Sequence, residues 1–375
     1  VAAALVGAMA AGVQLLQSLA YAIVWLLNGL RLAIFSLLLS PAFLRLGYHY
    51  FRDPRVARGV RFGPARRNFL DIYCPLQASE ARSSGEQGVP VVIAVMGGAW
   101  IIGHRAWNAQ LGRRLMDAGV LVFAIDYRNW PLGEVPDMVE DLDRGVAWVF
   151  KNAAAYGGDI SRIVLTGQSA GAHLSSLLLL RKSMQEVIEE AGDLEAAKGS
   201  QRLEEGRHRW SVGDVGGYVG VSGPYDLRLL QERLQARWLG GGLLKAMCPH
   251  GDVDDCSPMS LLESAEWKAV APRAATKWPP VVLFHGEADK TVPPACSSRF
   301  AEALRAAGVQ AQADLRPGVA HAEVIVEGPM RGEDHQLHLL LPLLGDSAAR
   351  IAALPPLAPM LPRWIIGLAS RIMPF

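Results

Sequence analysis

A five-residue motif near the middle of the chain constrains the fold more than any other feature. The motif, Gly-Gln-Ser-Ala-Gly at 167–171, follows the short apolar run Ile163–Leu165 and precedes a helical pattern from Ala170 to Leu180. A serine in this strand–turn–helix context is typical of a nucleophile elbow, where a strained turn exposes the hydroxyl at the edge of a sheet. Flanking glycines suit the turn because side chains there would crowd it. The motif predicts a nucleophilic Ser169; the alternative is a tight glycine turn that carries a surface serine.

The chain around this motif alternates between buried strands and helices. The expected strands are near-continuous apolar runs at 89–96, 120–126, 163–165, 218–222, 280–285 and 310–315, after an opening hairpin at 60–62 and 69–73. The expected helices lie at 104–118, 137–151, 293–307 and 334–344, and 79–88 is expected to be a polar loop. Such alternation predicts an α/β fold, a mostly parallel central sheet with helices on both faces. The charged stretch 183–209 is expected as a solvated insertion, and 224–278 as a lid over the site.

The N-terminal segment holds much of the apolar excess in a chain that is 51% hydrophobic. Leu5–Leu27 carries no charge and is long enough to cross a bilayer as a helix. Asn28-Gly29 predicts a break before a second, shorter apolar run, Leu32–Leu44, which Pro41 interrupts. We expect residues 1–46 to be a membrane anchor; a helical cap packed on the catalytic core is the alternative. A removed signal peptide is disfavoured because the run has no basic front.

These patterns divide the chain into an anchor at 1–46, a catalytic domain at 47–349 and an apolar tail at 350–375. The tail is expected to lie on the membrane surface or against the N-terminal segment. Arginines dominate the stretch just after the anchor, which indicates a cytosolic face for the catalytic domain. They are Arg52, Arg55, Arg58, Arg61, Arg66 and Arg67.

Charge and cysteine content exclude other classes of function. A net charge of +1 gives no field for binding nucleic acid. The four cysteines show no paired spacing, so we expect reduced thiols and neither a disulfide framework nor a metal site. No motif for a cofactor occurs, and none is expected.

A nucleophilic serine needs a histidine base and an orienting acid, which in this topology follow later strands. Asp289 follows the strand at 280–285, and His321 follows the strand at 310–315. Both stand at the carboxyl ends of strands, where open sheets of this class place their sites. We therefore predict Asp289 and His321 as the partners of Ser169. The weaker rivals are His173, His285, His335, His338, Glu287 and Asp226.

The oxyanion formed by attack on an ester needs backbone N–H donors. Ala170 supplies one donor as the residue after the nucleophile, and the loop after the strand at 89–96 supplies the others. That loop contains Gly97, Gly98 and Ala99, and with Gln168 these residues complete the predicted oxyanion and substrate-binding set. The alternative is an ordinary glycine turn.

Longer motifs carry a resemblance to a known family. They are Gly97–Gly103 with Ala106-Trp107, Asp126–Asn129, Asp137–Val139, Tyr156–Asp159, Gly167–His173, Phe284–Gly286, Pro329–Gly332 and Pro374-Phe375. From about Leu46 onward the chain resembles the isoprenylcysteine alpha-carbonyl methylesterases, a branch of the α/β-hydrolase superfamily near the hormone-sensitive-lipase-like esterases. One departure is Met96, where many esterases of the wider group carry a histidine, so the outer hydrogen bonds of the loop stay open.

The resemblance implies an α/β-hydrolase fold and hydrolysis of the methyl ester on a C-terminal S-prenylated cysteine. It implies prenylated protein C-termini or prenylcysteine methyl esters as substrates, in endoplasmic-reticulum and Golgi membranes. Two alternatives from the same fold are a formamidase and a general carboxylesterase. A third, from another class, is a hydrolase-fold binding module that has lost catalysis, although the presence of Ser169, Asp289 and His321 disfavours it.

Overall fold

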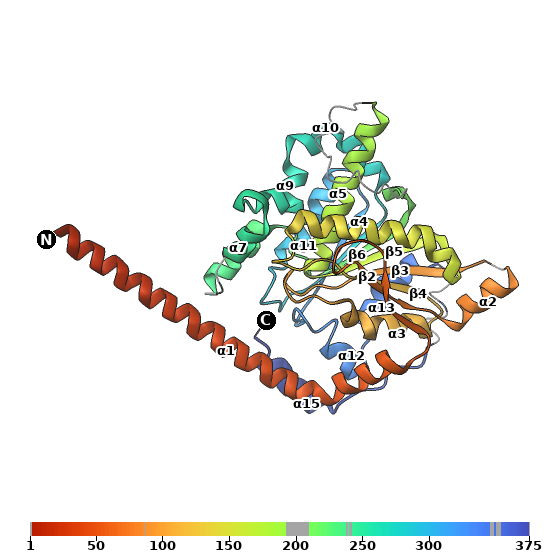
Figure 1. The fold of residues 1–375 in the computed structure, drawn as a ribbon, viewed down its shortest axis with the longest axis horizontal. Coiled ribbons are helices and arrows are strands. Elements are labelled where there is room, and N and C mark those ends of the chain that lie inside the picture. The colour runs from red at the N-terminus through yellow and green to blue at the C-terminus, as the bar shows by residue number, and fades with distance from the viewer. Residues whose placement is uncertain are drawn as a thin grey trace.

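An eight-stranded sheet forms the centre of the catalytic part of the chain (Figure 1). The computed structural model describes residues 2–85, 87–192, 210–237, 239, 242–345, 349 and 354–374. The strand order is β1-β2-β4-β3-β5-β6-β7-β8; β2 is antiparallel to both of its neighbours, and the strands from β4 to β8 are parallel. The strands are β1 (Val56–Arg61), β2 (Phe69–Tyr73), β3 (Val89–Val95), β4 (Leu121–Ile125), β5 (Gly158–Gln168), β6 (Val215–Val221), β7 (Val281–Gly286) and β8 (Ala311–Arg316). The predicted mostly parallel sheet is confirmed.

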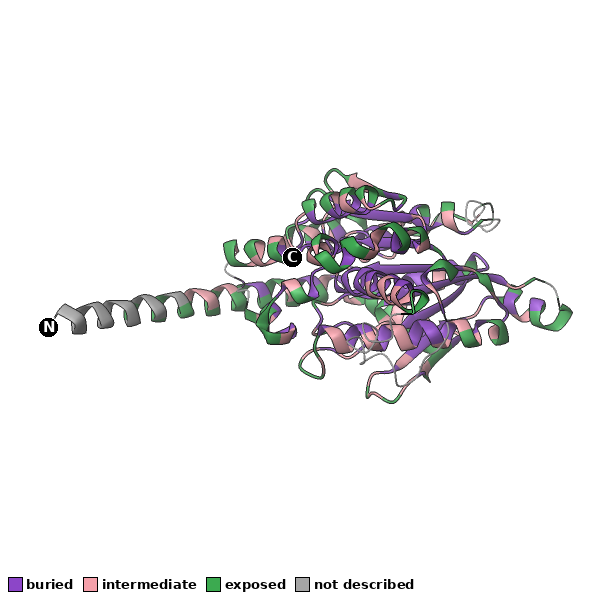
Figure 2. Cartoon of the chain, turned by 90° about the horizontal axis from the view of Figure 1, so that it is seen from above, coloured by how far each residue is buried: buried purple, intermediate pink, exposed green. Residues whose placement is uncertain are grey.

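Helices cover both faces of the sheet, which explains the near-continuous apolar strand runs. On β3, Val91 and Ile93 face one apolar cluster while Val92 and Ala94 face another, and all four are fully buried. Figure 2 shows the sheet as buried between these layers. The first face packs against α4 (Val135–Asn152), α5 (Ala170–Glu190) and α11 (Ala295–Ala306), the second against α3 (Ala109–Asp117) and α13 (His335–Leu340).

The N-terminal segment is one helix, α1 (Ala2–Arg52), which continues through the break expected at Asn28-Gly29 and through Pro41. The expected break was wrong because a single asparagine and glycine weaken a long helix by about 1 kcal/mol each without ending it. Close to Pro41, Leu39 and Ala42 are buried in one cluster with residues of the C-terminal helix α15 (Arg363–Ile372). The tail therefore lies against the N-terminal segment.

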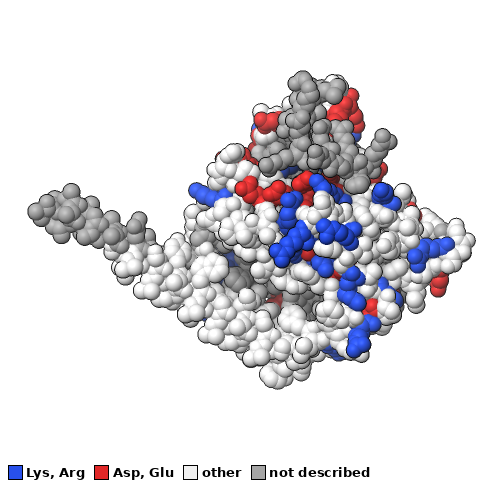
Figure 3. Space-filling view, in the orientation of Figure 1, with Lys and Arg blue, Asp and Glu red and all other residues white. Residues whose placement is uncertain are grey.

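Most of the described part of α1 is exposed, unlike a buried cap. Leu26, Leu37 and Leu44 are 74%, 72% and 75% exposed. The segment Ser18–Arg52 contains an 18-residue window with a mean hydropathy of 2.0, and it is long and apolar enough to cross a membrane, by length and composition only. Figure 1 shows α1 projecting away from the body, and Figure 3 shows little charge along its visible described surface.

Two connecting segments differ in detail from the sequence expectations. The expected polar loop at 79–88 contains a helix, α2 (Leu76–Ser84), because Ala78 and Ala81 are buried on one of its faces. The expected lid at 224–278 is mostly helical, and Trp267 is its largest fully buried side chain. Its helices are α7 (Leu227–Ala236), α8 (Gly242–Met247), α9 (Pro258–Glu263) and α10 (Ala265–Ala274). Trp238, Gly240 and most of the charged insertion, 193–209, lie outside the described residues.

Candidate active site

Ser169 occupies the turn between β5 and α5. Its backbone is in the left-handed region, with φ 51° and ψ −121°, which is strained for a residue with a side chain. The Ser169 N–H donates to the carbonyl of Val221, at 2.8 Å, and so ties the turn to the end of β6. A Cβ atom on Gly171 would lie 2.2 Å from the Val95 carbonyl oxygen, so this position requires glycine.

Asp289 and His321 meet Ser169 at the carboxyl end of the sheet. Asp289 lies three residues after β7, and His321 lies five residues after β8. The His321 Nε2 atom is 3.0 Å from the Ser169 Oγ atom, and its Nδ1 atom is 2.6 Å from Asp289 Oδ2. Asp289 is 3% exposed and His321 is 9% exposed, so bulk water competes little for these hydrogen bonds. The three predicted side chains thus form one hydrogen-bonded line.

The surroundings of Asp289 keep its carboxylate ionised. Burial alone would raise its pKa, but the neighbouring His321 and His285 and their hydrogen bonds hold the pKa well below its usual range. The N–H groups of Thr291 and Val292 also donate to Asp289 Oδ1, at 2.8 and 2.9 Å. An ionised acid can fix the orientation of His321 and stabilise the imidazolium that forms when it takes a proton.

The rival residues lie elsewhere in the structure or support the site. His285 is buried between Ser297 Oγ, 2.7 Å from Nδ1, and Asp289 Oδ2, 3.1 Å from Nε2. Asp226 caps the N-terminus of α7, where it accepts hydrogen bonds from two backbone N–H groups. Glu287 is exposed, and His335 and His338 lie on α13. Within the described chain, only His321 among these histidines is within hydrogen-bonding distance of Ser169 Oγ.

His173 is fully buried on α5, one turn after Ser169. Its Nδ1 atom accepts from the indole N–H of Trp100, at 3.2 Å, and its Nε2–H donates to the Cys256 carbonyl, at 2.7 Å. Burial lowers the pKa of His173 to about 4, so the ring is neutral at pH 7. His173 therefore links the loop after β3, through Trp100, to the helix that follows the nucleophile.

The loop after β3 lies directly against Ser169. A Cβ atom on Gly97 would be 2.7 Å from the Ser169 Cβ atom. Ala99 and Trp100 both have left-handed backbones, with φ 49° and 61°. The N–H groups of Gly98 and Ala99 have no hydrogen-bond acceptor among the described residues. They therefore present free donors close to the nucleophile.

Two further predicted residues complete this side of the site. Ala170 begins α5, and the first N–H groups of a helix have no intrahelical partner. Gln168, the last residue of β5, is 6% exposed. Its Oε1 atom would lie 2.7 Å from a Cβ atom on Gly97, so the Gln168 side chain packs against the loop.

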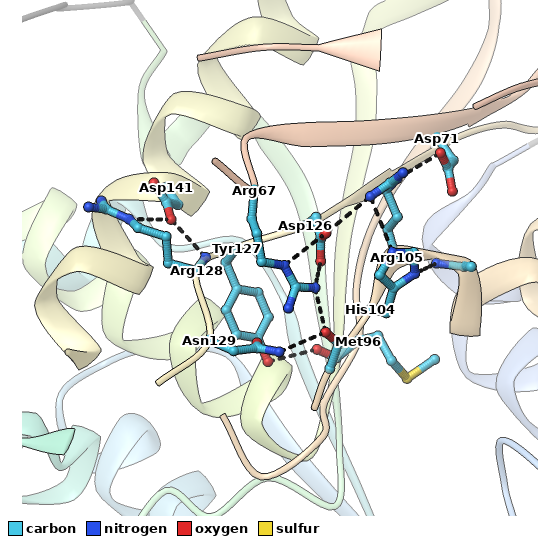
Figure 4. A network of polar contacts seen from close by, with 12 residues as sticks. Arg67, Asp71, Met96, His104, Arg105, Asp126, Tyr127, Arg128, Asn129 and Asp141 are labelled. Atoms are coloured by element: carbon cyan, nitrogen blue, oxygen red, sulfur yellow. Dashed lines mark hydrogen bonds and ion pairs between the residues drawn. The ribbon is translucent and has the colours of Figure 1, made fainter. Parts of the chain in front are cut away.

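The outer hydrogen bonds of this loop come from residues that were not predicted as part of the site. The Tyr127 hydroxyl donates to the Met96 carbonyl, at 3.1 Å, and Arg67 and Asn129 both donate to the Gly103 carbonyl (Figure 4). The available sequence signal was the run 126–129, which follows β4, the strand beside β3. Its polar residues at the end of a buried strand pointed to this edge of the sheet.

The arrangement fits acyl transfer, because a hydroxyl, a base and a loop with free N–H donors lie together at the carboxyl end of the sheet. Among the described residues, no group of three or more His, Cys, Asp or Glu side chains is placed to hold a metal ion. Cys74, Cys248, Cys256 and Cys296 are all free thiols.

Comparisons with known proteins agree with this geometry. Residues 70–304 match the BD-FAE family. The chain is 36% identical to a probable isoprenylcysteine alpha-carbonyl methylesterase of Oryza sativa subsp. japonica, over 94% of this chain and 78% of that protein. It is 33% identical to the isoprenylcysteine alpha-carbonyl methylesterase of Arabidopsis thaliana, over 96% of this chain and 80% of that protein.

Solved structures with a similar fold include esterase B from Lactobacillus rhamnosis, with a TM-score of 0.59. The two sequences are 18% identical, and the match covers 87% of this chain and 98% of that chain. Esterase 2 of Thermogutta terrifontis gives a TM-score of 0.51, 22% identity and coverage of 72% and 86%. These structures support the fold, and the two methylesterases match over most of both chains.

Proposed function

Because the chain belongs to the isoprenylcysteine alpha-carbonyl methylesterase family, we propose that this serine hydrolase cleaves the methyl ester of a C-terminal S-prenylated cysteine. The observation that carries the mechanism is the line of hydrogen bonds from Ser169 Oγ through His321 to Asp289. It lies beside a loop with free N–H donors. In this proposal Ser169 is the nucleophile, His321 the general base and acid, and Asp289 the residue that orients His321.

The reaction has two steps that share one base. Ser169 Oγ bonds to the ester carbonyl carbon while its proton passes to His321 Nε2, and the oxyanion binds the N–H groups of Gly98, Ala99 and Ala170. His321 then returns the proton to the methoxide oxygen as the C–O bond breaks, so that methanol leaves. A water molecule attacks the acyl-enzyme with His321 again as base, which releases the prenylcysteine carboxylate and restores Ser169.

The prenyl group requires apolar walls near the serine. A pocket that Met96 lines at the start of the loop also contains Trp107, Leu111, Ile325 and Leu357; Ser169 and His321 are not among its lining residues. Polar groups share the pocket, among them the amide of Gln110 and the Arg114–Asp334 ion pair. Ile102 and Trp107 are exposed on the loop and just after it, at 60% and 48%. These side chains support a substrate with a long hydrocarbon group.

We also propose that α1 anchors the enzyme in endoplasmic-reticulum and Golgi membranes with its catalytic domain in the cytosol. A helical segment such as Leu5–Leu27 is about 35 Å long, enough for the hydrocarbon core of a bilayer. The supporting observations are the exposed apolar surface of α1 and the arginines that follow it.

The substrate test compares three esters on purified full-length enzyme: farnesylcysteine methyl ester, cysteine methyl ester and a short p-nitrophenyl ester. Transition-state binding grows with buried apolar area, at about 25 cal/mol per Å², so we expect a much higher kcat/KM with the farnesyl group. Ser169→Ala is expected to lower all three rates by at least about 10⁴-fold. Ser83→Ala, at an exposed position of helix α2, is the matched control and should leave all rates unchanged.

Two results would contradict this proposal at different levels. Equal kcat/KM with and without the farnesyl group would remove the methylesterase assignment but leave the serine-hydrolase mechanism standing. Full activity in Ser169→Ala would remove the mechanism itself.

The location is tested separately in sealed microsomes. We expect the full chain to resist extraction by carbonate and its catalytic domain to be digested by protease added outside. Release by carbonate, or protection of the domain until detergent is added, would overturn the anchor or its orientation.

A further inference from the structure

The loop that presents the free N–H donors is held at both ends by side chains from neighbouring elements. At its start, the Met96 carbonyl accepts from the Tyr127 hydroxyl, at 3.1 Å. At its end, the Gly103 carbonyl accepts two hydrogen bonds, from Arg67 Nη2 at 2.6 Å and from Asn129 Nδ2 at 3.0 Å. Figure 4 shows Arg67, Tyr127 and Asn129 side by side over the carbonyl groups that they bind.

Gly103 is closely coupled to the donor end of the loop. The N–H groups of Ile101 and Ile102 both donate to the Gly98 carbonyl, at 3.0 Å, so the chain folds back on itself. A Cβ atom on Gly98 would lie 2.3 Å from the Gly103 nitrogen, and one on Gly103 would lie 2.4 Å from the Gly97 carbonyl oxygen. Because these backbone segments touch, a displacement of Gly103 displaces Gly97 and Gly98 as well.

Arg67 is itself fixed by a buried network of opposite charges. Its Nη2 atom is 2.6 Å from Asp126 Oδ1, and Asp126 is 3% exposed. Arg105 binds the other oxygen of Asp126, at 3.1 Å, and also binds Asp71 Oδ1, at 2.8 Å. The guanidinium group therefore has one orientation in which it reaches both the carboxylate and the Gly103 carbonyl.

The loop needs such support because its own backbone does not favour the required shape. Ala99 and Trp100 are consecutive left-handed residues with side chains, a conformation that persists only where the surroundings enforce it. An oxyanion donor must stand about 2.7–3.1 Å from the developing charge, so a displacement of less than 1 Å weakens it.

We propose that Arg67 and Asn129 are positioning residues for the hydrolytic reaction, acting through the Gly103 carbonyl on the N–H donors of Gly98 and Ala99. This inference rests on the proposed function for the role of those donors. It assigns the arginine after the anchor a part in catalysis, in addition to any part in membrane orientation.

The test measures kcat and KM on a short p-nitrophenyl ester for Arg67→Met, Arg67→Lys and Asn129→Leu in the full chain. Active sites are counted by titration with a p-nitrophenyl phosphonate, so that misfolded protein does not lower the apparent kcat. We expect kcat per site to fall about 30-fold in Arg67→Met and about 10-fold in Asn129→Leu, with KM within about 2-fold. Arg67→Lys, which keeps the positive charge and an N–H donor group but loses the planar fork, should recover part of the loss.

Arg66→Met is the matched control because it removes the same charge from the residue that directly precedes Arg67. Arg66 is exposed and makes no hydrogen bond or ion pair with the rest of the described chain. Its kcat and KM should equal those of the wild type.

A second measurement separates positioning from general stability. An alkyl trifluoromethyl ketone forms a hemiketal oxyanion with the serine, so its Ki should rise in proportion to the loss of kcat/KM in each variant. Because Arg67 and Asn129 share one acceptor, the double variant should lose less than the product of the single losses. The pH midpoint of kcat/KM should stay unchanged, since His321 is not touched.

Several outcomes would overturn the inference. One is a wild-type kcat per titrated site in Arg67→Met, with only the number of sites reduced, which would show a purely structural role. Another is an unchanged Ki for the ketone together with a lower kcat. A failure of the farnesyl preference would leave the inference standing because this assay uses a short ester, whereas full activity in Ser169→Ala would remove its basis.

Discussion

The two sides of the site that face Ser169 are built in different ways. On the base side, Asp289 and His321 are side chains on the loops after β7 and β8; His321 touches the nucleophile directly, and Asp289 touches His321. On the oxyanion side, the groups that face the serine belong to the backbone of 97–99, and the side chains that hold them stand one step further away. The base side therefore acts through the chemistry of its side chains, and the oxyanion side acts through the position of its backbone N–H groups.

This difference predicts how substitutions act on each side. A change on the base side removes a reacting or directly hydrogen-bonded group, so its whole effect falls on catalysis. On the oxyanion side, a change in a supporting side chain leaves the N–H donors present but displaced. The loss of kcat is therefore smaller, and the protein also loses some stability.

The largest effect is expected for Asp289→Asn on the base side. The amide cannot hold His321 in the required tautomer or stabilise its positive charge, so kcat should fall about 10⁴-fold with the fold retained. The measurement is kcat on the short p-nitrophenyl ester at pH 8. Glu287→Gln, in the same loop but exposed, is the control and should lose less than about 3-fold. Equal losses in the two variants would mean that the orienting acid has been misassigned.

Much of the base side could be predicted from the sequence because its chemistry is carried by residue type. Ser169 has a local motif, and the polar residues Asp289 and His321 follow apolar strands, so their place at the sheet edge follows from topology. The oxyanion side was predicted only as far as the glycine loop. Arg67 stood out only as one charge in a basic stretch, because a bond from a side chain to a distant backbone carbonyl leaves no spacing pattern.

The fold likewise has some features that could be predicted from the sequence and others that could not. The alternation of apolar runs gave the parallel sheet correctly because each strand is buried on both faces. The continuity of α1 through Pro41 could not be predicted, since it depends on contacts with α15, more than 300 residues away in the sequence. Helix α2 was missed because its apolar face consists of only two alanines.

A second prediction concerns stability and the buried Glu327, at the start of the helix α12 (Glu327–Arg331). It is 2% exposed, and its Oε2 atom has no hydrogen-bond partner among the described residues. Burial raises its pKa from 4.5 to about 7, so the folded protein holds this proton more tightly than the unfolded chain. The wild type should therefore lose stability as the pH rises from about 4.5 to about 7.

Glu327→Gln should remove this pH dependence. We expect the variant to be more stable than the wild type by about 3 kcal/mol at pH 8 and by almost nothing below pH 4.5. Urea unfolding at both pH values measures the difference, with Glu80→Gln on the exposed face of α2 as the control. A gain of the same size at both pH values would show that the carboxylate charge is not the cause.

On the oxyanion side, His173→Phe breaks the link between Trp100 and α5. Two buried groups, the Trp100 indole N–H and the Cys256 carbonyl, lose their partners, which costs about 1–3 kcal/mol of stability. We expect kcat per titrated site to fall about 10-fold on the short ester. A wild-type kcat in folded His173→Phe would show that the loop does not depend on this contact.

The lowered pKa of His173 predicts a second effect of His173→Phe, on how the stability of the protein depends on pH. Burial lowers that pKa to about 4, so the unfolded chain binds the proton at a higher pH than the folded protein. The wild type should lose stability as the pH falls from about 6.5 to about 4, and His173→Phe should lack this component. Unfolding curves at pH 7 and pH 5 measure it; equal pH dependence in both proteins would contradict the neutral, buried histidine.

The smallest effect is expected for Tyr50→Phe, at the far end of the network that supports the oxyanion side. The Tyr50 hydroxyl, in the last turns of α1, donates to Asp71 Oδ2 at 2.7 Å, and Asp71 in turn binds Arg105. Asp71 Oδ1 also accepts from the Gly59 N–H, so the carboxylate keeps two partners when the hydroxyl is removed. We expect a stability loss of about 1 kcal/mol and a kcat within about 2-fold of the wild type. Tyr48 lies two residues earlier on α1 and is exposed, so Tyr48→Phe should change neither the stability nor kcat. A loss of kcat as large as that of Arg67→Met would mean that the anchor helix sets the shape of the oxyanion loop, and the two sides of the site would then differ in their dependence on the membrane as well as in their construction.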